Sequence, residues 1–248
     1  MNSLHSSLSA LLDFFLPRRC PSCGRELARR ETMLCAACWM NLELVGHTDW
    51  SQNQHIMAWA DYPFVCRAGA YAIYKRKNVA ARLVHNLKYR HHYPAGNWMG
   101  QLAGHALKDS GLFDGIEVII PIPITFGRKM HRGFNQSHMI ALGLSEELGI
   151  PVAADALRCT RHGTSHTHFS YEQRLRHLNA DLQSDTDDTI SALITTFGLR
   201  SHALERLQGR HILLVDDVIT TGSTIRAALH ALRDIPDITV TVFAWSWV

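Results

Sequence analysis

Continuous apolar runs and helically spaced apolar residues alternate along most of this chain. The runs at residues 116–120 and 212–215 are nearly free of polar residues, which predicts strands buried on both faces of a parallel sheet. Further strands are predicted at residues 71–74, 197–200 and 239–244, and around 151–153 and 156–158. Helical spacing predicts helices at residues 8–16, 79–107 (with a break near Pro94) and 135–148, and from Ile225 onward. Strands that alternate with helices predict an α/β fold on a parallel sheet.

Length and composition limit the classes of protein that this chain can belong to. Its 248 residues allow one large domain, or one domain with an appendage, and 46% hydrophobic residues suit a sizeable core. A net charge of +3 gives no global electrostatic argument for nucleic acid. No apolar stretch approaches the roughly 20 residues that span a bilayer. The first seven residues lack the Lys or Arg of a signal peptide, so a cytoplasmic location is the default expectation.

Four of the six cysteines form two C-x-x-C pairs, Cys20 with Cys23 and Cys35 with Cys38. This spacing predicts a tetrahedral structural zinc site, with Pro21 and Gly24 in tight turns. Two disulfides or a redox pair are the alternatives. The first is disfavoured in a chain without a secretory signal, and the second usually needs a single pair within a βαβ unit.

Residues 211–225 carry the most specific pattern in the sequence. Asp216 and Asp217 are expected where the strand at 212–215 emerges, and a loop rich in hydroxyl groups then leads into a helix. A helix N-terminus beside the carboxyl end of a parallel strand binds phosphate, and carboxylates accept hydrogen bonds from sugar hydroxyls. The pattern predicts a sugar-phosphate site, although acids that merely cap a helix are the simpler alternative. The loop residues are Thr220, Thr221, Gly222, Ser223 and Thr224.

A second group of cations follows the strand at 116–120. Arg128, Lys129 and Arg132 are expected on one loop that ends at a helix capped by Asn135. Such a loop suits a polyanion such as pyrophosphate or a nucleic-acid backbone. An ordinary basic surface loop is the alternative.

A basic stretch between residues 75 and 92 is interleaved with aromatic residues. Cations that contact phosphates and rings that stack on bases are typical of single-stranded nucleic-acid binding. A solvated basic face over core aromatics is the alternative. The candidate nucleic-acid contacts are Lys75, Arg76, Lys77, Lys88 and Arg90, near Tyr71, Tyr74, Tyr89, Tyr93 and Trp98.

Residues 211–225 resemble the ribose-phosphate motif of type I phosphoribosyltransferases, whose ligand is phosphoribosyl pyrophosphate (PRPP). Taken with the cysteine pairs, Leu87-Lys88-Tyr89, Pro121-Ile-Pro123 and the string at residues 132–137 (RGFNQS), the chain resembles the ComF family. The resemblance implies an N-terminal helix, zinc ribbon and connector (residues 1–60) before a phosphoribosyltransferase-like domain (61–248). It implies structural zinc, and PRPP bound with Mg²⁺, as well as a role in DNA uptake or utilisation with single-stranded DNA. The chain lacks the G-x-x-x-x-G-K-[ST] motif of ATPases, so any energy for DNA translocation would come from another protein. A helicase or DNA-translocation protein is therefore the expected partner.

By the same resemblance, Asp216 and Asp217 would hold the ribose hydroxyls, residues 220–224 the 5′-phosphate, and Arg128 and Arg132 the pyrophosphate. Arg161 and Arg176 match the family's mobile loop and would join the two aspartates as catalytic residues. His166 and Ala180 depart from the family's Gln and Val in that loop, while Arg158, Thr167 and Asn179 match it. An active phosphoribosyltransferase with an unidentified base or amine acceptor is therefore one alternative. A non-catalytic zinc-ribbon docking protein is another.

Overall fold

The computed structural model describes residues 18–46, 49–89, 93–159 and 197–248. Its first half contains α2 (Ala36–Met40), α3 (Gln54–Met57), β1 (Val65–Ile73), α4 (Val79–Tyr89), α5 (Tyr93–Leu107), β2 (Val118–Pro121) and α6 (Phe126–Arg132). Its second half contains α7 (Gln136–Leu148), β3 (Leu157–Cys159), β4 (Phe197–Leu199), α10 (Ala203–Leu207), β5 (His211–Ile219), α11 (Ser223–Leu232) and β6 (Thr239–Trp247).

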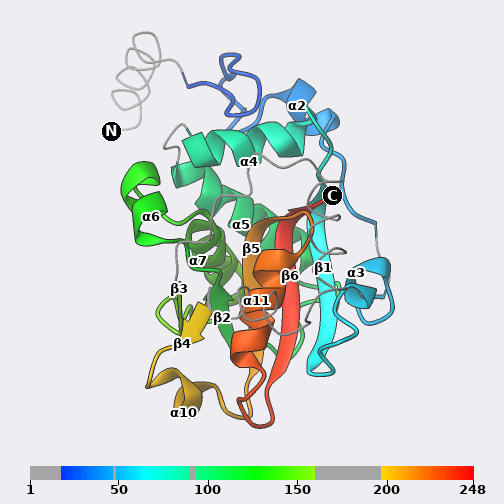
Figure 1. The fold of residues 1–248 in the computed structure, drawn as a ribbon. Coiled ribbons are helices and arrows are strands. Elements are labelled where there is room, and N and C mark those ends of the chain that lie inside the picture. The colour runs from blue at the N-terminus through cyan, green and yellow to red at the C-terminus, as the bar shows by residue number, and fades with distance from the viewer. Residues whose placement is uncertain (1–17, 47–48, 90–92, 160–196) are drawn as a thin grey trace, which may run out of the picture.

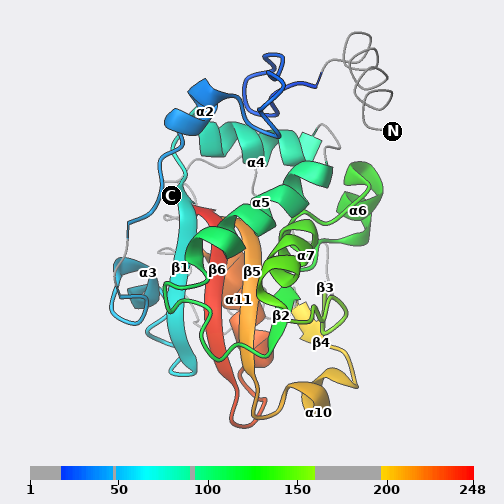
Figure 2. The same cartoon turned by 180° about the vertical axis from the view of Figure 1, so that it is seen from behind.

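The centre of the fold is a four-stranded parallel sheet in the order β1-β6-β5-β2. Most residues of its two middle strands, β5 and β6, are buried, which is why apolar residues dominate both sequences. Helix α11 covers one face, and α5 and α7 cover the other (Figure 1, Figure 2). The predicted parallel α/β sheet is confirmed. A separate antiparallel pair, β3 and β4, lies beside it.

Helix α4 lies across the carboxyl-terminal edge of the sheet, between the strands and the N-terminal cysteine segment (Figure 1, Figure 2). Parallel sheets bind ligands at this edge. The cysteines Cys20, Cys35 and Cys38 share one hydrophobic cluster with the buried face of α4. The described cysteine segment therefore packs directly on the larger unit, while the boundary near residue 60 stays a prediction.

Several predicted elements need correction. The strand predicted at 71–74 begins earlier, at Val65, and ends at Ile73. The prediction missed its first half because Cys66 and Arg67 interrupt the apolar run, although the pairing with β6 continues past them. The strand predicted around residues 151–153 is wrong: Val152 makes one isolated bridge to Ile119. The predicted connector contains the short helix α3, capped by the Asn53 side chain.

The predicted helix over residues 79–107 is two helices, as the break near Pro94 indicated. Helix α4 ends at Tyr89 and α5 begins at Tyr93, so Pro94 lies in the first turn of α5, where proline is tolerated. The predicted helix at 135–148 is confirmed as α7. The Asn135 side chain accepts a hydrogen bond from the Ser137 N–H at 3.1 Å, so the predicted cap is also confirmed.

Helices α5 and α7 approach each other closely through glycine. Gly96, Gly100 and Gly104 are spaced by four residues on α5, and they face Met139, Ile140 and Glu147 respectively. On α7, Gly143 faces the carbonyl of Asn97. Side chains of the two helices also bond, because Asn97 and Gln101 donate to the two carboxylate oxygens of Glu146 at 3.0 and 2.6 Å. This contact fixes α7 at the sheet edge where the candidate ligand residues lie.

Candidate functional site

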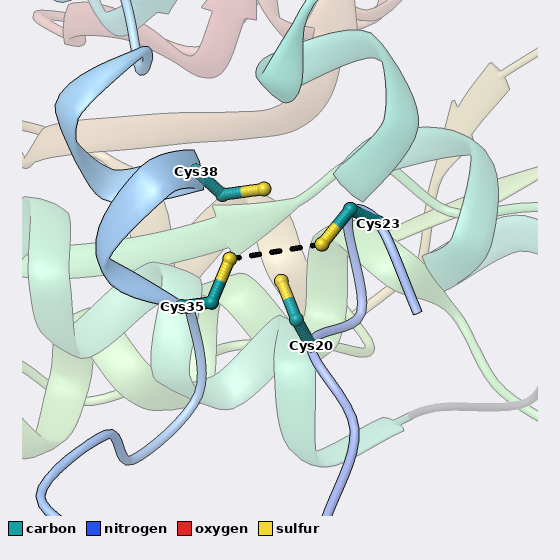
Figure 3. A group of neighbouring side chains, drawn as sticks. All are labelled: Cys20, Cys23, Cys35 and Cys38. Atoms are coloured by element: carbon teal, nitrogen blue, oxygen red, sulfur yellow. Dashed lines mark hydrogen bonds between the residues drawn. The ribbon is translucent and has the colours of Figure 1, made fainter. Parts of the chain in front are cut away.

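The four predicted zinc ligands converge on one point (Figure 3). Their sulfur atoms all lie within 4.8 Å of one another, and the Cys23 and Cys35 sulfurs are 3.6 Å apart. Tetrahedral zinc with Zn–S bonds of about 2.3 Å separates its sulfur ligands by about 3.8 Å, so the cluster fits zinc. Four sulfur ligands leave no open position, which indicates a structural site.

Backbone turns hold these cysteines in place. The Cys20 N–H donates to the Arg25 carbonyl, and the Gly24 N–H donates to the Cys20 carbonyl, both at 2.8 Å. Gly24 has φ +77°, a conformation that favours glycine. The Glu31 carboxylate accepts hydrogen bonds from the N–H groups of Ala28 and Ala36, which lowers its pKa and joins the two cysteine turns.

The cysteine segment bonds to α4 as well as packing on it. The Arg82 Nε donates to the Ser22 hydroxyl at 3.1 Å, and the Asn86 side-chain amide donates to the Pro21 carbonyl. Ser22 and Pro21 lie within the first C-x-x-C turn. These bonds fix the position of the first cysteine turn relative to α4.

Asp216 and Asp217 lie at the carboxyl end of β5, inside the strand rather than after it. The sequence-based expectation is corrected here, because β5 continues to pair with β6 through Ile219. The Ser137 hydroxyl donates to Asp216 Oδ1 at 2.8 Å, and the Asp217 N–H donates to the same oxygen at 2.8 Å. Burial, and next the neighbouring charge of Asp217, raise the pKa of Asp216 to about 7. Asp217 is buried and Asp216 is half-buried, so the two acids offer carboxyl oxygens at this edge of the sheet.

Lys88 contacts this acid pair, and no sequence pattern assigned it there. Its Nζ lies 2.8 Å from Asp217 Oδ2, with side chains 22% and 6% exposed respectively. We predicted Lys88 as a nucleic-acid contact in one basic stretch with Lys75, Arg76 and Lys77. Those three lie before α4, whereas Lys88 lies in its last turn. One helical turn separates Lys88 from buried Val84, so its proximity to the apolar face was a detectable signal.

The predicted phosphate loop follows β5 and leads into α11. Gly222 is the N-cap of α11 with φ +76°, and Thr221 Oγ1 and Ser223 Oγ are 3.3 Å apart. An added Cβ at Gly222 would lie 2.7 Å from the Trp59 ring, so glycine is required for space as well as for conformation. Thr220 and Thr224 are exposed. The arrangement presents hydroxyls and the N-terminal turn of a ten-residue helix next to the acid pair.

The cationic segment after β2 is a short helix, α6, and the predicted loop is wrong. The Thr125 side chain caps its start, and Gly133 ends it with φ +78°. Arg128 and Lys129 are exposed on α6, while Arg132 donates to Gln136 Oε1 at 3.1 Å and lies 5.8 Å from the centre of the Tyr89 ring. Arg132 thus connects α6 to the end of α4 that carries Lys88.

The other residues predicted for the site or for nucleic-acid binding lie on different elements or outside the described residues. Lys75 pairs with Glu43, and Arg76 and Lys77 are exposed. Arg158 lies on β3. Arg90, Arg161, Arg176, His166, Thr167, Asn179 and Ala180 lie outside the described residues. In the described ranges, every helix is too short or too polar to span a membrane.

Known proteins match both parts of the chain. A double zinc ribbon domain matches residues 11–48, and a phosphoribosyl transferase domain matches residues 138–236. A 37-residue segment is 65% identical to the bifunctional protein PyrR of Corynebacterium diphtheriae, which covers 14% of this chain and 20% of that protein. A solved structure of an allosteric regulatory enzyme of purine biosynthesis aligns with a TM-score of 0.35 at 18% identity, over 60% of this chain and 26% of that one.

Longer matches are found among proteins of DNA utilisation and competence. The DNA utilization protein YhgH of Escherichia coli O157:H7 is 33% identical over 147 residues, which are 58% of this chain and 56% of that protein. Competence protein F of Haemophilus influenzae is 27% identical over 154 residues, 61% of this chain and 60% of that protein. The matches thus span just over half the length of these relatives. The predicted resemblance to the ComF family is confirmed, because the chain is a homologue of the DNA utilization proteins and of competence protein F with a zinc ribbon before a phosphoribosyl transferase domain.

Proposed function

We propose that this protein binds PRPP with Mg²⁺ at the carboxyl edge of its sheet and acts in DNA uptake or utilisation. The observation that carries the proposal is the position of Asp216 and Asp217 beside the Gly222 turn and the N-terminus of α11. Ribose hydroxyls would donate to the carboxylates, and the 5′-phosphate would accept from the turn and the helix N-terminus. The phosphoribosyl transferase domain match at residues 138–236 includes all of these residues.

The acids and cations around the site suit a phosphorylated ligand that binds together with a metal ion. Carboxylate oxygens are ligands that Mg²⁺ accepts directly or through water, and Asp216 and Asp217 could serve in this way. Arg132 and the exposed Arg128 supply cations for pyrophosphate on the side of α6. Bound Mg²⁺ would neutralise part of the charge on the pyrophosphate.

The double variant Asp216→Asn/Asp217→Asn is expected to lose PRPP binding by at least about 100-fold, because each amide keeps one acceptor oxygen and places an NH2 donor where the carboxyl group had its second oxygen. Calorimetric titration of the zinc-loaded protein with PRPP and Mg²⁺ measures this loss. Asp109→Asn/Asp114→Asn is the matched control, because it removes two exposed carboxylates elsewhere in the fold. Equal binding by both double variants would reject the site.

Single-stranded DNA is the second ligand that we propose, and aromatic side chains near the site support it. Tyr89, Tyr93 and Phe126 are large, exposed rings, and Arg132 lies over Tyr89. Exposed rings beside cations are what sequence-tolerant strand binding uses. Affinity for an oligothymidylate, measured by fluorescence anisotropy, is expected to fall as salt rises, because phosphate contacts release counterions. An affinity independent of salt would contradict strand binding.

Two alternative functions each have one supporting observation. The phosphoribosyl transferase domain match favours transfer of phosphoribosyl to a base or amine, in which pyrophosphate would leave as the acceptor bonds to the anomeric carbon. Release of pyrophosphate that is lost in Asp217→Asn would identify this activity. Exposed Trp39, Met40 and Leu44 on the cysteine segment favour a docking contact for a DNA-translocation or helicase protein.

A further inference from the structure

The ion pair between Lys88 and Asp217 lies within the proposed ligand site rather than on the surface. The nitrogen–oxygen distance is 2.8 Å, Asp217 is almost fully buried, and Lys88 is half-buried. Lys88 reaches this position from α4, which lies outside the 138–236 match that contains Asp216, Asp217 and the Gly222 turn. Sequence comparison of that domain alone therefore does not identify it.

An ammonium on a side chain that is only 22% exposed favours an anionic partner in every state of the site. In the described structure that partner is Asp217, and loss of one member of a buried pair leaves an uncompensated charge that is strongly destabilising. Ribose hydroxyls that bind Asp217 would compete for the oxygen that Lys88 now contacts. The ligand must then supply Lys88 with a new acceptor, or pay the desolvation penalty of leaving it unpaired.

PRPP supplies such an acceptor at the right place. Its pyrophosphate is bonded to the anomeric carbon, next to the carbon that carries the 2′-hydroxyl, so a cation beside the hydroxyl-binding carboxylate is near the pyrophosphate oxygens. The lysine side chain suits an exchange of partners, because its compact ammonium sits on a flexible four-carbon stem. Arg132 lies over the neighbouring Tyr89 ring, which places a second cation on the same side.

We propose that Lys88 is a pyrophosphate-binding residue that exchanges Asp217 for a pyrophosphate oxygen when PRPP enters. The proposal rests on the proposed function, because it requires a ribose with a pyrophosphate at the anomeric carbon. It predicts that Lys88 distinguishes PRPP from ribose 5-phosphate, which has the same hydroxyls and 5′-phosphate but lacks the pyrophosphate.

Lys88→Met is expected to weaken PRPP binding about 10- to 100-fold and to change ribose 5-phosphate binding by less than about threefold. Both ligands are titrated calorimetrically into the zinc-loaded full chain at constant Mg²⁺. Lys88→Arg, which keeps the charge, is expected to recover most of the PRPP affinity. Lys108→Met is the matched control, because it removes an exposed lysine beyond the far end of α5, and it should bind both ligands as the parent does.

Each outcome decides the proposal. A selective loss of PRPP affinity that Lys88→Arg recovers supports it. Unchanged binding, equal losses for both ligands, or tighter binding of both by Lys88→Met would overturn it while leaving the PRPP site intact. If the parent protein binds ribose 5-phosphate but not PRPP, or neither ligand, the proposed function itself fails and this inference fails with it.

Discussion

Gly100→Ala is expected to lower the free energy of unfolding by at least about 3 kcal/mol, enough to prevent folding if the parent stability is modest. An added Cβ at Gly100 would lie 2.0 Å from the Ile140 carbonyl oxygen and 2.8 Å from the Leu144 nitrogen. Both atoms belong to the backbone of α7, so rotation of a side chain cannot relieve the clash. The higher helix propensity of alanine, about 1 kcal/mol, is too small to compensate for separating two packed helices.

The measurement is the midpoint of thermal unfolding, which is expected to fall by roughly 6 to 12 °C for a loss of about 3 kcal/mol in a chain of this size. Gly104→Ala is the matched control, because it lies one turn further along the same face and its Cβ would meet the Glu147 side chain at 2.9 Å. That contact is 0.9 Å longer than the 2.0 Å contact at Gly100 and needs only a small shift of the helices, so the loss should be smaller. Equal midpoints for the two variants would contradict the close backbone contact.

The close contact between α5 and α7 also positions a residue of the candidate site. Helix α7 carries Ser137, whose hydroxyl donates to Asp216, and it begins directly after the cationic helix α6. If α7 moves away from α5, the Ser137 hydroxyl moves relative to the sheet edge. Any folded Gly100→Ala protein should therefore bind PRPP more weakly than Gly104→Ala.

The sequence predicted those parts of the site that are local in the chain. Asp216, Asp217 and Gly222 belong to one strand–loop–helix unit, and the four cysteines form two short pairs, so fixed spacing revealed both. Lys88 was missed because its partner is distant in the sequence. Composition grouped it with Lys75 to Lys77, although Lys88 lies one helical turn after buried Val84 and therefore beside the apolar face of α4.

Elements without an apolar face were also missed. Helix α6 has no buried residue among those described, so it has no periodic apolar signal, and its basic residues suggested a loop. The glycines of α5 keep helical spacing, but a residue without a side chain contributes nothing to an apolar pattern. The parallel sheet itself was predictable, since β5 contains the continuous apolar run 212–215 and β6 is mostly apolar, as strands buried on both faces are.

Zinc is expected to stabilise the ligand site as well as the cysteine segment, because α4 connects the two. Ser22 and Pro21 bond to Arg82 and Asn86 on α4, and the last turn of the same helix presents Lys88 to Asp217. Structural zinc supplies about 10–16 kcal/mol of apparent binding free energy in small zinc-finger peptides, so its loss should disorder the cysteine segment. Helix α4 would then lose its outer cover at the end where the segment packs.

Cys23→Ser is therefore expected to lose zinc, to speed amide hydrogen exchange along residues 79–89, and to weaken PRPP binding at least about tenfold. Cys23 is the exposed member of the four, so the substitution removes a ligand and little packing. Cys66→Ser is the matched control, because Cys66 lies on β1 and outside the metal cluster. Zinc content, hydrogen exchange and calorimetric PRPP titration are measured on both variants. Slow exchange in α4 and unchanged PRPP affinity after zinc loss would show that the cysteine segment and the ligand site are independent, because α4 would then hold Lys88 without support from the metal.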